Sequence, residues 1–448
     1  MRPDRSTRPL RIAVVGGGIS GLSAAWLLSQ RHEVVLFEGD GRLGGHANTV
    51  QAPDGAGGQT PVDTGFIVYN EENYPNFTAL LAHLRVRTLD ADMALSVSLD
   101  DGAFEYSSGS LFAQRRNFFS ARFWRMLRDV TRFYRHGPRD IAALEGPLTS
   151  LDDYLKQKGY CQAFRDDHLL PQAAAIWSTP LSAIRDYPAA ALIRFFQNHG
   201  MMRIFGRGLW RTVEGGSRAY VEKLAEAFWG ETRTGARVAG VRRTPHGAEV
   251  RLAGGEVERF DHVVIATHGD QALALLDDPS PEERRILSAF RYTRNLAVLH
   301  SDRRLMPKRR AAWTSWNHIG KRSAPEEGCV TYWMNRLQSL PAKPELFVTL
   351  NPTRDIAPEA VVRTDVYDHP LFDAGAIAAQ DELWSLQGVR STWFCGSYFG
   401  HGFHEDGLQS GLAVAEQLGG VRRPWRVADE SGRIRLPRTQ VDPVSVAA

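Results

Sequence analysis

The chain has 448 residues, of which 43% are hydrophobic and 23% are charged, a balance typical of a soluble globular protein. The net charge of +3 gives no reason to expect nucleic acid as a partner. Cys161, Cys329 and Cys395 lie far apart in sequence, so we expect neither a metal site nor a disulfide framework. The length predicts two or three domains. No apolar run approaches the ~18 residues of a membrane-spanning helix, which favours a cytoplasmic location.

A glycine-rich turn follows the first predicted strand, Ile12–Val15. Gly16, Gly18 and Gly21 form the spacing GxGxxG directly before a predicted helix. Gly16 permits a tight turn, Gly18 lets the backbone approach a pyrophosphate at the helix N-terminus, and Gly21 lets the helix pack closely on the strand. The stretch therefore predicts a dinucleotide-binding site.

An acidic residue completes this nucleotide-binding pattern. Glu38 follows the second predicted strand, Val34–Phe37, about 20 residues after the first glycine, where its carboxylate can accept hydrogen bonds from an adenosine ribose. A glycine-rich turn without a ligand would leave Glu38 unexplained. We therefore predict that Glu38 contacts the cofactor together with Ile19 and Ser20 of the first helical turn.

The next residues, "EGDGRLGGHANT", indicate which dinucleotide is bound. They resemble the Glu–x–x–x–Arg–x–Gly–Gly extension of flavoproteins in the amine oxidase, phytoene desaturase and protoporphyrinogen oxidase superfamily. The resemblance implies non-covalent FAD, with Gly39 in contact and with Gly44 and Gly45 carrying the chain along the flavin side. Arg42 is expected to contact phosphate or flavin; the alternative is a solvated loop arginine.

Two later segments resemble the part of the superfamily sequence in which the chain re-enters the FAD-binding domain after the first insertion. Residues 212–228 combine a Gly-Gly turn with a helix, and residues 234–268 alternate like hairpin strands before a buried strand, Val263–Ala266. The resemblance implies that Val238 holds the adenine side of FAD through its backbone. His268 is expected to be an ordinary loop residue.

A second glycine-rich turn lies within residues 394–420, after a last strand. A helix is predicted from Gly407 to Leu418, directly after Asp406. In the superfamily that the chain resembles, this helix start faces the isoalloxazine ring, where its partial positive charge stabilises the reduced flavin. Either Glu405 or Asp406 matches the acid of the family, and an ordinary N-cap is the alternative for Asp406. The implied contacts are Gly396, Glu405, Asp406, Gly407 and Leu408, and glycines 400, 402 and 407 are expected to let the backbone lie against the ring.

These motifs predict an α/β fold with two domains. The first is a Rossmann-like FAD-binding domain of the GR2 type, and the second is a discontinuous α+β substrate domain built from the insertions. The predicted ranges are 10–75, 205–285 and 390–420 for the FAD-binding domain, 76–204 and 286–389 for the substrate domain, and 421–448 for a C-terminal tail, which is expected to be a surface extension.

Residues 117–137 carry the strongest amphipathic pattern of the first insertion. One interpretation is a helix that packs its apolar face on protein and keeps a solvated basic face. The other is a surface that attracts anionic lipid headgroups and holds the protein peripherally on the inner face of a membrane, with Trp124 as an interfacial anchor. The arginines of the basic face are Arg122, Arg125, Arg128, Arg132 and Arg135.

Aromatic residues of the insertions are candidates for the walls of a substrate cavity. Residues 173–180 and 191–202 suit either a cavity wall or the core, and the core is the favoured interpretation. In the second insertion the candidates are Trp313, Trp316, Tyr332 and Trp333, although packing inside a β-sheet is the favoured interpretation of each single residue.

No side chain stands out as a general base, and His401, His404 and Cys395 are expected to be packing residues. The lack of a recognisable general base is typical of a flavoenzyme, in which the cofactor supplies the redox chemistry. The stretches "TYWMNRLQ" and "GFHEDGLQSGLAVA" resemble a bacterial subgroup of predicted NAD/FAD-binding proteins associated with cyclopropane-fatty-acyl-phospholipid synthase-like enzymes.

The resemblance implies an oxidase or desaturase that transfers a hydride from a lipophilic, fatty-acyl substrate to flavin N5. Three alternatives stay open: an amine oxidase acting on a soluble amine, a redox-neutral flavin isomerase, and a non-catalytic flavoprotein. Neither the catalytic side chains nor the oligomeric state can be read from the sequence.

Overall fold

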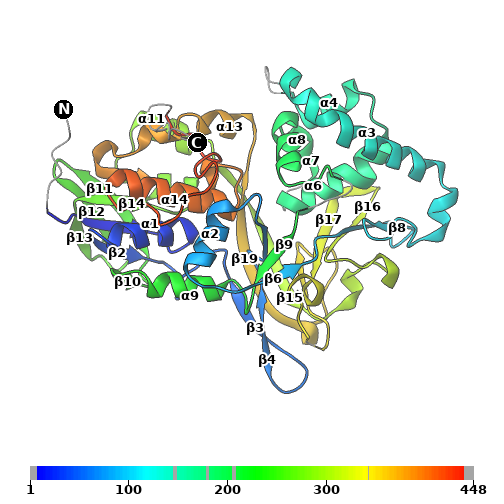
Figure 1. Ribbon diagram of the computed structural model, residues 1–448, viewed down its shortest axis with the longest axis horizontal. Coiled ribbons are helices and arrows are strands. Elements are labelled where there is room, and N and C mark those ends of the chain that lie inside the picture. The colour runs from blue at the N-terminus through cyan, green and yellow to red at the C-terminus, as the bar shows by residue number, and fades with distance from the viewer. Residues whose placement is uncertain (1–7, 145–148, 178–180, 204–207, 342, 438–448) are drawn as a thin grey trace, which may run out of the picture.

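A five-stranded parallel sheet forms the centre of one half of the molecule (Figure 1). The computed structural model describes residues 8–144, 149–177, 181–203, 208–341 and 343–437, so the predicted boundary at 205, residues 178–180 and the tail beyond 437 lie outside the described residues. The strands, in spatial order, are β10 (Glu231–Arg233), β2 (Glu33–Phe37), β1 (Arg11–Val15), β14 (His262–Ile265) and β20 (Thr392–Phe394).

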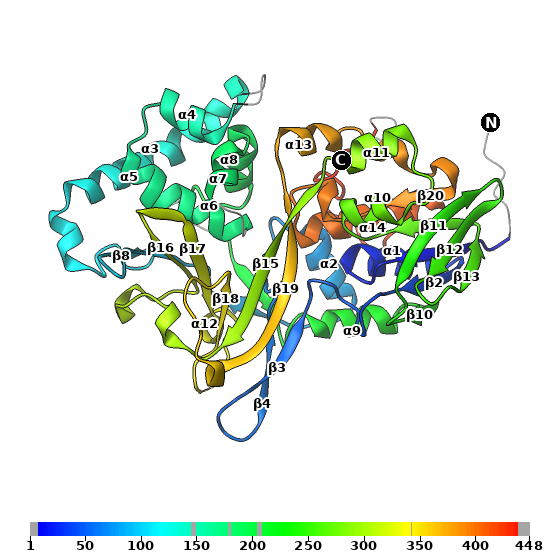
Figure 2. The same ribbon diagram turned by 180° about the vertical axis from the view of Figure 1, so that it is seen from behind.

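Different elements cover the two faces of this sheet. Helices pack on one face, and a three-stranded antiparallel sheet packs on the other, as the two opposite views show (Figures 1 and 2). The residues of β1, β2, β14 and β20 are mostly apolar and buried, as expected for parallel strands covered on both sides, whereas the edge strand β10 is polar and partly exposed. The covering elements are α1 (Ile19–Ser29), α9 (Arg218–Glu226) and α14 (His404–Leu418) on one side, and β11 (Val238–Thr244), β12 (Gly247–Leu252) and β13 (Val257–Phe260) on the other.

A seven-stranded mixed sheet organises the other half of the molecule. Its neighbours pair antiparallel except for β16 and β7, which are parallel. Five of its strands come from the second insertion, and β7 and β8 come from the first. In spatial order the strands are β19 (Val361–Leu371), β15 (Arg291–His300), β18 (Phe347–Leu350), β17 (Ala324–Trp333), β16 (Trp316–Lys321), β7 (Leu95–Leu99) and β8 (Phe104–Ser107).

Helices of the first insertion cover one end of this sheet (Figure 2). They are α3 (Ala121–Leu144), α4 (Leu151–Gln157), α5 (Gln162–Phe164), α6 (Leu170–Trp177), α7 (Leu181–Asp186) and α8 (Ala189–Asn198). The remaining elements are α2 (Pro75–His83), α10 (Gly269–Leu275), α11 (Pro281–Leu287), α12 (Met334–Leu337), α13 (Ala374–Gln380), the pair β3 (Thr49–Pro53) and β4 (Gln59–Asp63), and the small sheet of β5 (Val68–Asn70), β9 (Trp210–Val213) and β6 (Thr88–Ala91). Within the described ranges, no helix is both long and apolar enough to cross a bilayer.

Two glycines bring α14 into backbone contact with α1. A Cβ added at Gly411 would lie 2.2 Å from the carbonyl oxygen of Ser20, and one added at Gly407 would lie 2.8 Å from the Ser20 hydroxyl. Gly407 therefore faces α1, and the expectation that it spares room for a flat ring is wrong. A local contact also explains why position 400 is a glycine, because an added Cβ there would lie 2.5 Å from a carboxylate oxygen of Asp406.

The start of α14 differs from the prediction by one turn. The helix begins at His404, so Asp406 is its third residue rather than the residue before it. The Asp406 carboxylate accepts the backbone N–H of Phe403 at 2.7 Å, which satisfies one of the free donors at the helix start. Gly419 ends the helix as predicted, with φ of +104°.

The C-terminal segment after α14 is part of the core, and the expectation of a surface extension is wrong for residues 421–437. Trp425 stacks on Trp26 of α1, with ring centroids 5.9 Å apart. The Arg423 side chain is fully buried, pairs with Glu416 at 2.8 Å, and donates to the side-chain oxygen of Asn76 at 2.9 Å. The segment therefore clamps α1, α2 and α14 together.

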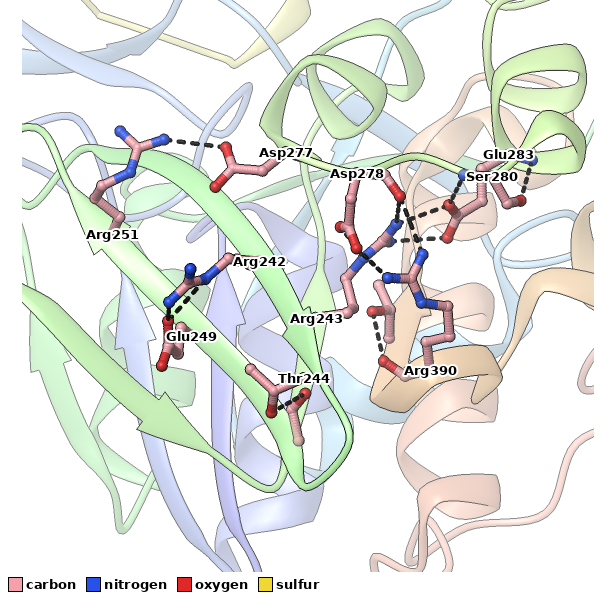
Figure 3. A network of polar contacts seen from close by, with 12 residues as sticks. Arg242, Arg243, Thr244, Glu249, Arg251, Asp277, Asp278, Ser280, Glu283 and Arg390 are labelled. Atoms are coloured by element: carbon pink, nitrogen blue, oxygen red, sulfur yellow. Dashed lines mark hydrogen bonds and ion pairs between the residues drawn. The ribbon is translucent and has the colours of Figure 1, made fainter.

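A buried arginine fixes the three-stranded sheet to its surroundings (Figure 3). Arg243 of β11 is fully buried and donates to the carboxylates of Asp278 at 2.7 Å and Glu283 at 2.9 Å. Arg390, in the turn before β20, donates to the Asp278 carbonyl at 3.0 Å. Because a buried charge is tolerated only when it is paired, this network holds β11, α11 and the edge of the parallel sheet in one arrangement.

We expect Gly411→Ala to lower the free energy of unfolding by about 2 kcal/mol. The added methyl overpacks the contact between α1 and α14, which costs about 1–3 kcal/mol and outweighs the higher helix propensity of alanine. Thermal unfolding of the purified protein measures this loss. Gly254→Ala is the matched control, because a Cβ at Gly254 meets no atom within 4 Å; equal stability of the two variants would contradict the close-contact argument.

Candidate active site

A cavity of about 400 Å³ begins at the glycine turn after β1. Gly16 has φ of +107°, and a Cβ there would lie 2.8 Å from the carbonyl oxygen of Ala266. Gly18 is the N-cap of α1 and has no capping side chain, so the N–H groups of the first turn are left for another acceptor. A Cβ at Gly18 would meet nothing within 4 Å, which places open space directly against the helix start.

Glu38 stands beside this turn and lines the cavity. One carboxylate oxygen accepts the N–H of Gly17 at 2.7 Å, and the other accepts the N–H of Asp40 at 2.8 Å. These bonds fix the carboxylate at the end of β2. Ile19 and Ser20 also line the cavity, as predicted for residues near a dinucleotide.

The loop with the second glycine pair crosses the first turn. The N–H of Gly44 donates to the carbonyl of Gly17 at 2.8 Å, and a Cβ at Gly45 would lie 3.2 Å from the Cα of Gly18. Arg42 does not line the cavity. Its guanidinium donates to the carbonyls of Gly45 at 2.9 Å and Ala47 at 3.2 Å, so it holds the loop that lines the cavity.

The start of α14 forms the opposite wall. Gly396, Phe403 and His404 line the cavity there. Glu405 and Asp406 are fully buried and do not line it.

The two carboxylates point to other elements instead. Glu405 accepts the N–H of Phe77 at 2.9 Å and the amide of Asn76 at 2.8 Å, and it thereby caps the start of α2. Asp406 pairs with Arg433 at 2.7 Å. Burial raises the pKa of both carboxyl groups, and these hydrogen bonds and the Arg433 charge oppose that shift.

Further predicted contact residues support the cavity from behind. Gly21 touches the turn, since its Cβ would lie 1.9 Å from the carbonyl oxygen of Gly16. Val238 begins β11 and is buried. The predicted residues that do not line the cavity are Gly21, Gly39, Arg42, Val238, Glu405, Asp406, Gly407 and Leu408.

Three partly buried histidines line the cavity together. Sequence reasoning did not single out His46 or His369, and the expectation that His268 is an ordinary loop residue is wrong. The ring of His46 lies 5.7 Å from His268 and 5.7 Å from His369, measured between centroids. Burial, followed by repulsion from a neighbouring histidine, lowers the pKa of His46 to about 4, of His268 to about 4 and of His369 to about 3. The cluster is therefore neutral near pH 7, and no metal-binding group of three such residues occurs in the described part of the chain.

A fourth histidine belongs to the wall formed by α14. The His404 ring stacks on Phe66 with centroids 3.8 Å apart, and its Nε2 lies 2.5 Å from the hydroxyl of Tyr220. Burial, followed by the nearby His46, lowers the pKa of His404 to about 3. The available sequence signal was position: His46 directly follows the Gly44–Gly45 pair, and His268 follows the end of a buried strand.

The far end of the cavity is apolar. Two of the four aromatic candidates, Trp316 of β16 and Tyr332 of β17, line it. Trp313 and Trp333 pack against each other instead, with ring centroids 5.6 Å apart, as the favoured interpretation of these residues expects. Tyr332 and Trp333 are neighbours on one strand, so they point to opposite faces of the sheet. The favoured interpretation of residues 173–177 and 191–202 as core is only partly right, because members of both segments line the cavity. The apolar lining consists of Met93, Ile176, Trp177, Phe195, Met201, Trp316, Tyr332, Leu337 and Leu350.

This geometry fits FAD. Unpaired N–H groups at a glycine-lined helix start suit a diphosphate, and the carboxylate of Glu38 sits beside them for a ribose. The same cavity continues past the start of α14. Residues 19–419 match the family of flavin-containing amine oxidoreductases.

The chain belongs to this family. Its cofactor is FAD, its fold is the α/β FAD-binding fold that was predicted, and it is an FAD-dependent oxidoreductase of the amine oxidase family. The resemblance to the amine oxidase superfamily is thereby confirmed, and the resemblance to the bacterial subgroup stays a prediction. The assignment of individual residues to FAD stays a prediction.

Similarity to single curated proteins is confined to short stretches. The chain is 52% identical over 48 residues to protoporphyrinogen oxidase of Bos taurus, which is 10% of each chain. It is 46% identical over 47 residues to L-amino acid oxidase of Cerastes cerastes, which is 10% of this chain and 9% of the relative. The chain thus matches only about a tenth of the length of these relatives.

Solved structures share the fold along most of the chain. A putrescine oxidase has a TM-score of 0.66 at 16% identity, covering 92% of this chain and 99% of its own. The CLA-producing fatty acid isomerase from P. acnes has a TM-score of 0.65 at 14% identity, covering 91% and 98%. Cyclohexylamine oxidase from Brevibacterium oxydans IH-35A has a TM-score of 0.65 at 14% identity, covering 92% and 100%.

We expect Glu38→Gln to reduce the FAD content of the purified protein at least about tenfold, since charge-assisted hydrogen bonds at this carboxylate contribute about 1.5–3 kcal/mol. The ratio of visible flavin absorbance to protein absorbance measures the content. Glu33→Gln is the control, because Glu33 lies on the same strand but is exposed and pairs only with Arg11. Unchanged FAD in Glu38→Gln would remove Glu38 from the site.

The buried histidines predict that the protein loses stability as the pH falls below about 6.5. Between pH 6.5 and pH 3 the unfolded chain binds protons that folded His404 does not, because the folded pKa is lowered to about 3. The double variant His404→Phe/Tyr220→Phe should flatten this slope. Thermal unfolding midpoints of the holoprotein across this range test it. Exposed His246, changed to Gln, should leave the slope as it is; an equal flattening there would count against the argument.

Proposed function

We propose that this FAD-dependent oxidoreductase acts on a lipophilic, fatty-acyl substrate. The observation that carries the proposal is the apolar far end of the cavity, whose lining residues include no lysine, arginine, aspartate or glutamate. Such walls favour a hydrocarbon chain by removing its surface from water, at roughly 25 cal/mol per Å². An ammonium group placed among them would lose its hydration and meet aromatic faces but no carboxylate in the described lining.

The acids that line the cavity lie away from these walls. Glu38 accepts two backbone N–H groups beside the glycine turn. Asp368 belongs to β19, next to His369 of the histidine cluster. The neutral histidines add no positive charge to the cavity centre, which suits a substrate without charge at its reacting carbon.

The chain and the cofactor have separate tasks in this proposal. The glycine turn after β1 and Glu38 would hold FAD, which would supply a hydride acceptor when bound. The aromatic walls made by Trp177, Trp316 and Tyr332 orient an extended chain and exclude water. The neutral imidazoles of His46 and His369 can donate or accept one hydrogen bond at a polar substrate atom.

A redox-neutral isomerisation of a fatty acid is the second candidate. The same apolar lining supports it, and the fatty acid isomerase from P. acnes shares the fold. The two candidates differ in electron balance. An oxidase or desaturase consumes an acceptor with each turnover, whereas an isomerase converts substrate without a net acceptor.

We expect anaerobic addition of long-chain unsaturated fatty-acyl lipids to bleach the visible flavin absorbance of the holoprotein, while polyamines and aromatic amines leave it unchanged. If the lipid is converted without loss of flavin absorbance and without an electron acceptor, the protein is an isomerase rather than an oxidase or desaturase. Bleaching by amines alone would contradict the fatty-acyl proposal.

Filling the apolar end provides an independent test. Met93→Trp is expected to lower kcat/KM for long acyl chains about tenfold or more, because the chain loses room in a packed pocket. Leu89→Trp, at a half-exposed position outside the lining, is the control. Equal kinetics of the two variants would show that the chain does not enter this end.

A further inference from the structure

An ordered aromatic patch covers the tip of the substrate half, and the cavity does not use it. Five of the thirteen exposed large hydrophobic side chains of the described residues fall between positions 111 and 124. Phe119 is 86% exposed and Phe118 is 54% exposed. Single exposed apolar residues are common on soluble proteins, but a contiguous group indicates an interaction surface. We call Leu111, Phe112, Phe118, Phe119 and Trp124 the aromatic patch.

The side chains of the aromatic patch hold one another in place. Ring centroids lie 5.7 Å apart for Phe112 and Phe118, 5.8 Å for Phe112 and Trp124, and 5.3 Å for Phe118 and Phe119. The indole N–H of Trp124 donates to the carbonyl of Phe118 at 2.8 Å and ties the loop to the first turn of α3. Phe112 also contacts fully buried Phe123 at 5.8 Å, so the patch is anchored in the core.

Positive charge surrounds the aromatic patch. Residues 106–128 contain five arginines and neither aspartate nor glutamate. Arg115, Arg116 and Arg125 are exposed, and among the described residues none of them has a carboxylate within salt-bridge distance. The nearest acid along the helix, Asp129, is fully buried.

The structure changes which arginines of the predicted basic face are available. Arg122 forms a bidentate pair with buried Asp167 at 2.7 and 3.1 Å. Arg132 lies 4.5 Å over the ring of Tyr160. The apolar face of α3 packs on protein through side chains such as Phe123, so that face does not meet lipid. The exposed charge next to the aromatic patch instead comes from Arg115, Arg116 and Arg125.

We propose that the aromatic patch and its three arginines bind the surface of an anionic phospholipid bilayer. Phenylalanine and tryptophan insert at the level of the headgroups, and arginines around them attract anionic lipid. A second copy of the chain fits less well, because a symmetric contact would bring two arginine rims together. The segment lies at the edge of the molecule opposite β11, β12 and β13, where a flat surface can reach it (Figures 1 and 2).

This surface does not depend on the identity of the substrate, so it goes beyond the proposed function. Helix α3 nevertheless packs against α8, whose Phe195 lines the apolar end of the cavity. That contact includes Gly137 of α3 and Ile193 of α8, about 20 Å along the helix from Trp124, so the patch would hold the protein on the bilayer without forming part of the cavity. Activity on a short, water-soluble acyl substrate should not require the patch.

Vesicle flotation of the holoprotein tests the proposal. Wild type should float with equimolar phosphatidylcholine and phosphatidylglycerol, and much less with phosphatidylcholine alone. Phe118→Ser/Phe119→Ser should reduce flotation about tenfold or more, and Arg115→Ala/Arg116→Ala should reduce it about fivefold for each charge removed. FAD content and the thermal midpoint verify that the variants are folded.

Trp229→Ser is the matched control, because Trp229 is a 74% exposed aromatic residue on the FAD-binding half. Its flotation should equal that of wild type. Equal flotation of wild type with both vesicle types, failure to float with either, or an equal loss in Trp229→Ser would overturn the proposal. A dimer that disappears in Phe118→Ser/Phe119→Ser without any flotation would assign the patch to a second copy instead.

Discussion

The contact between α1 and α14 is the constraint on which the site depends. These helices start almost four hundred residues apart in sequence, yet Gly411 leaves no room for a Cβ against the Ser20 carbonyl. Only this close approach lets the starts of both helices line one cavity. Helix starts carry partial positive charge and free N–H donors, so bringing two of them together creates one extended site for an anionic cofactor.

The partial positive charge of the converging helix starts is balanced in part by buried acids of the chain, and these acids lie away from the cavity. Glu405 caps α2, while Asp406 holds the first turn of its own helix and pairs with Arg433. Both carboxylates lie behind the wall that α14 presents to the cavity. Their negative charge therefore stabilises the scaffold, and the free donors of α1 remain directed at the cavity. The C-terminal segment is essential to this arrangement, because it contributes Arg433.

Local patterns predicted the parts of the site that depend on neighbours in sequence. The glycine spacing, the acid at the end of β2 and the last helix could be read in this way, and they sufficed for the family and its cofactor. The partners of Glu405 could not be predicted, since Asn76 lies 329 positions away along the chain. The histidine cluster and the packed C-terminal segment were missed for the same reason: packing between distant segments determines them. A local rule does separate Tyr332 from Trp333, because strand alternation places neighbouring residues on opposite faces of the sheet.

The cavity combines a polar and an apolar environment, and no single segment of the chain forms both. The glycine turns and Glu38 form a polar end from short, early segments, and the insertions add an apolar end from β16, β17 and α6. The histidines line the same cavity, and their low pKa values follow from burial and, next, from repulsion between neighbouring histidines. A polar cofactor and a hydrocarbon chain can therefore share one cavity without a buried, unpaired charge between them, which is the arrangement that burial of charge in a protein interior demands.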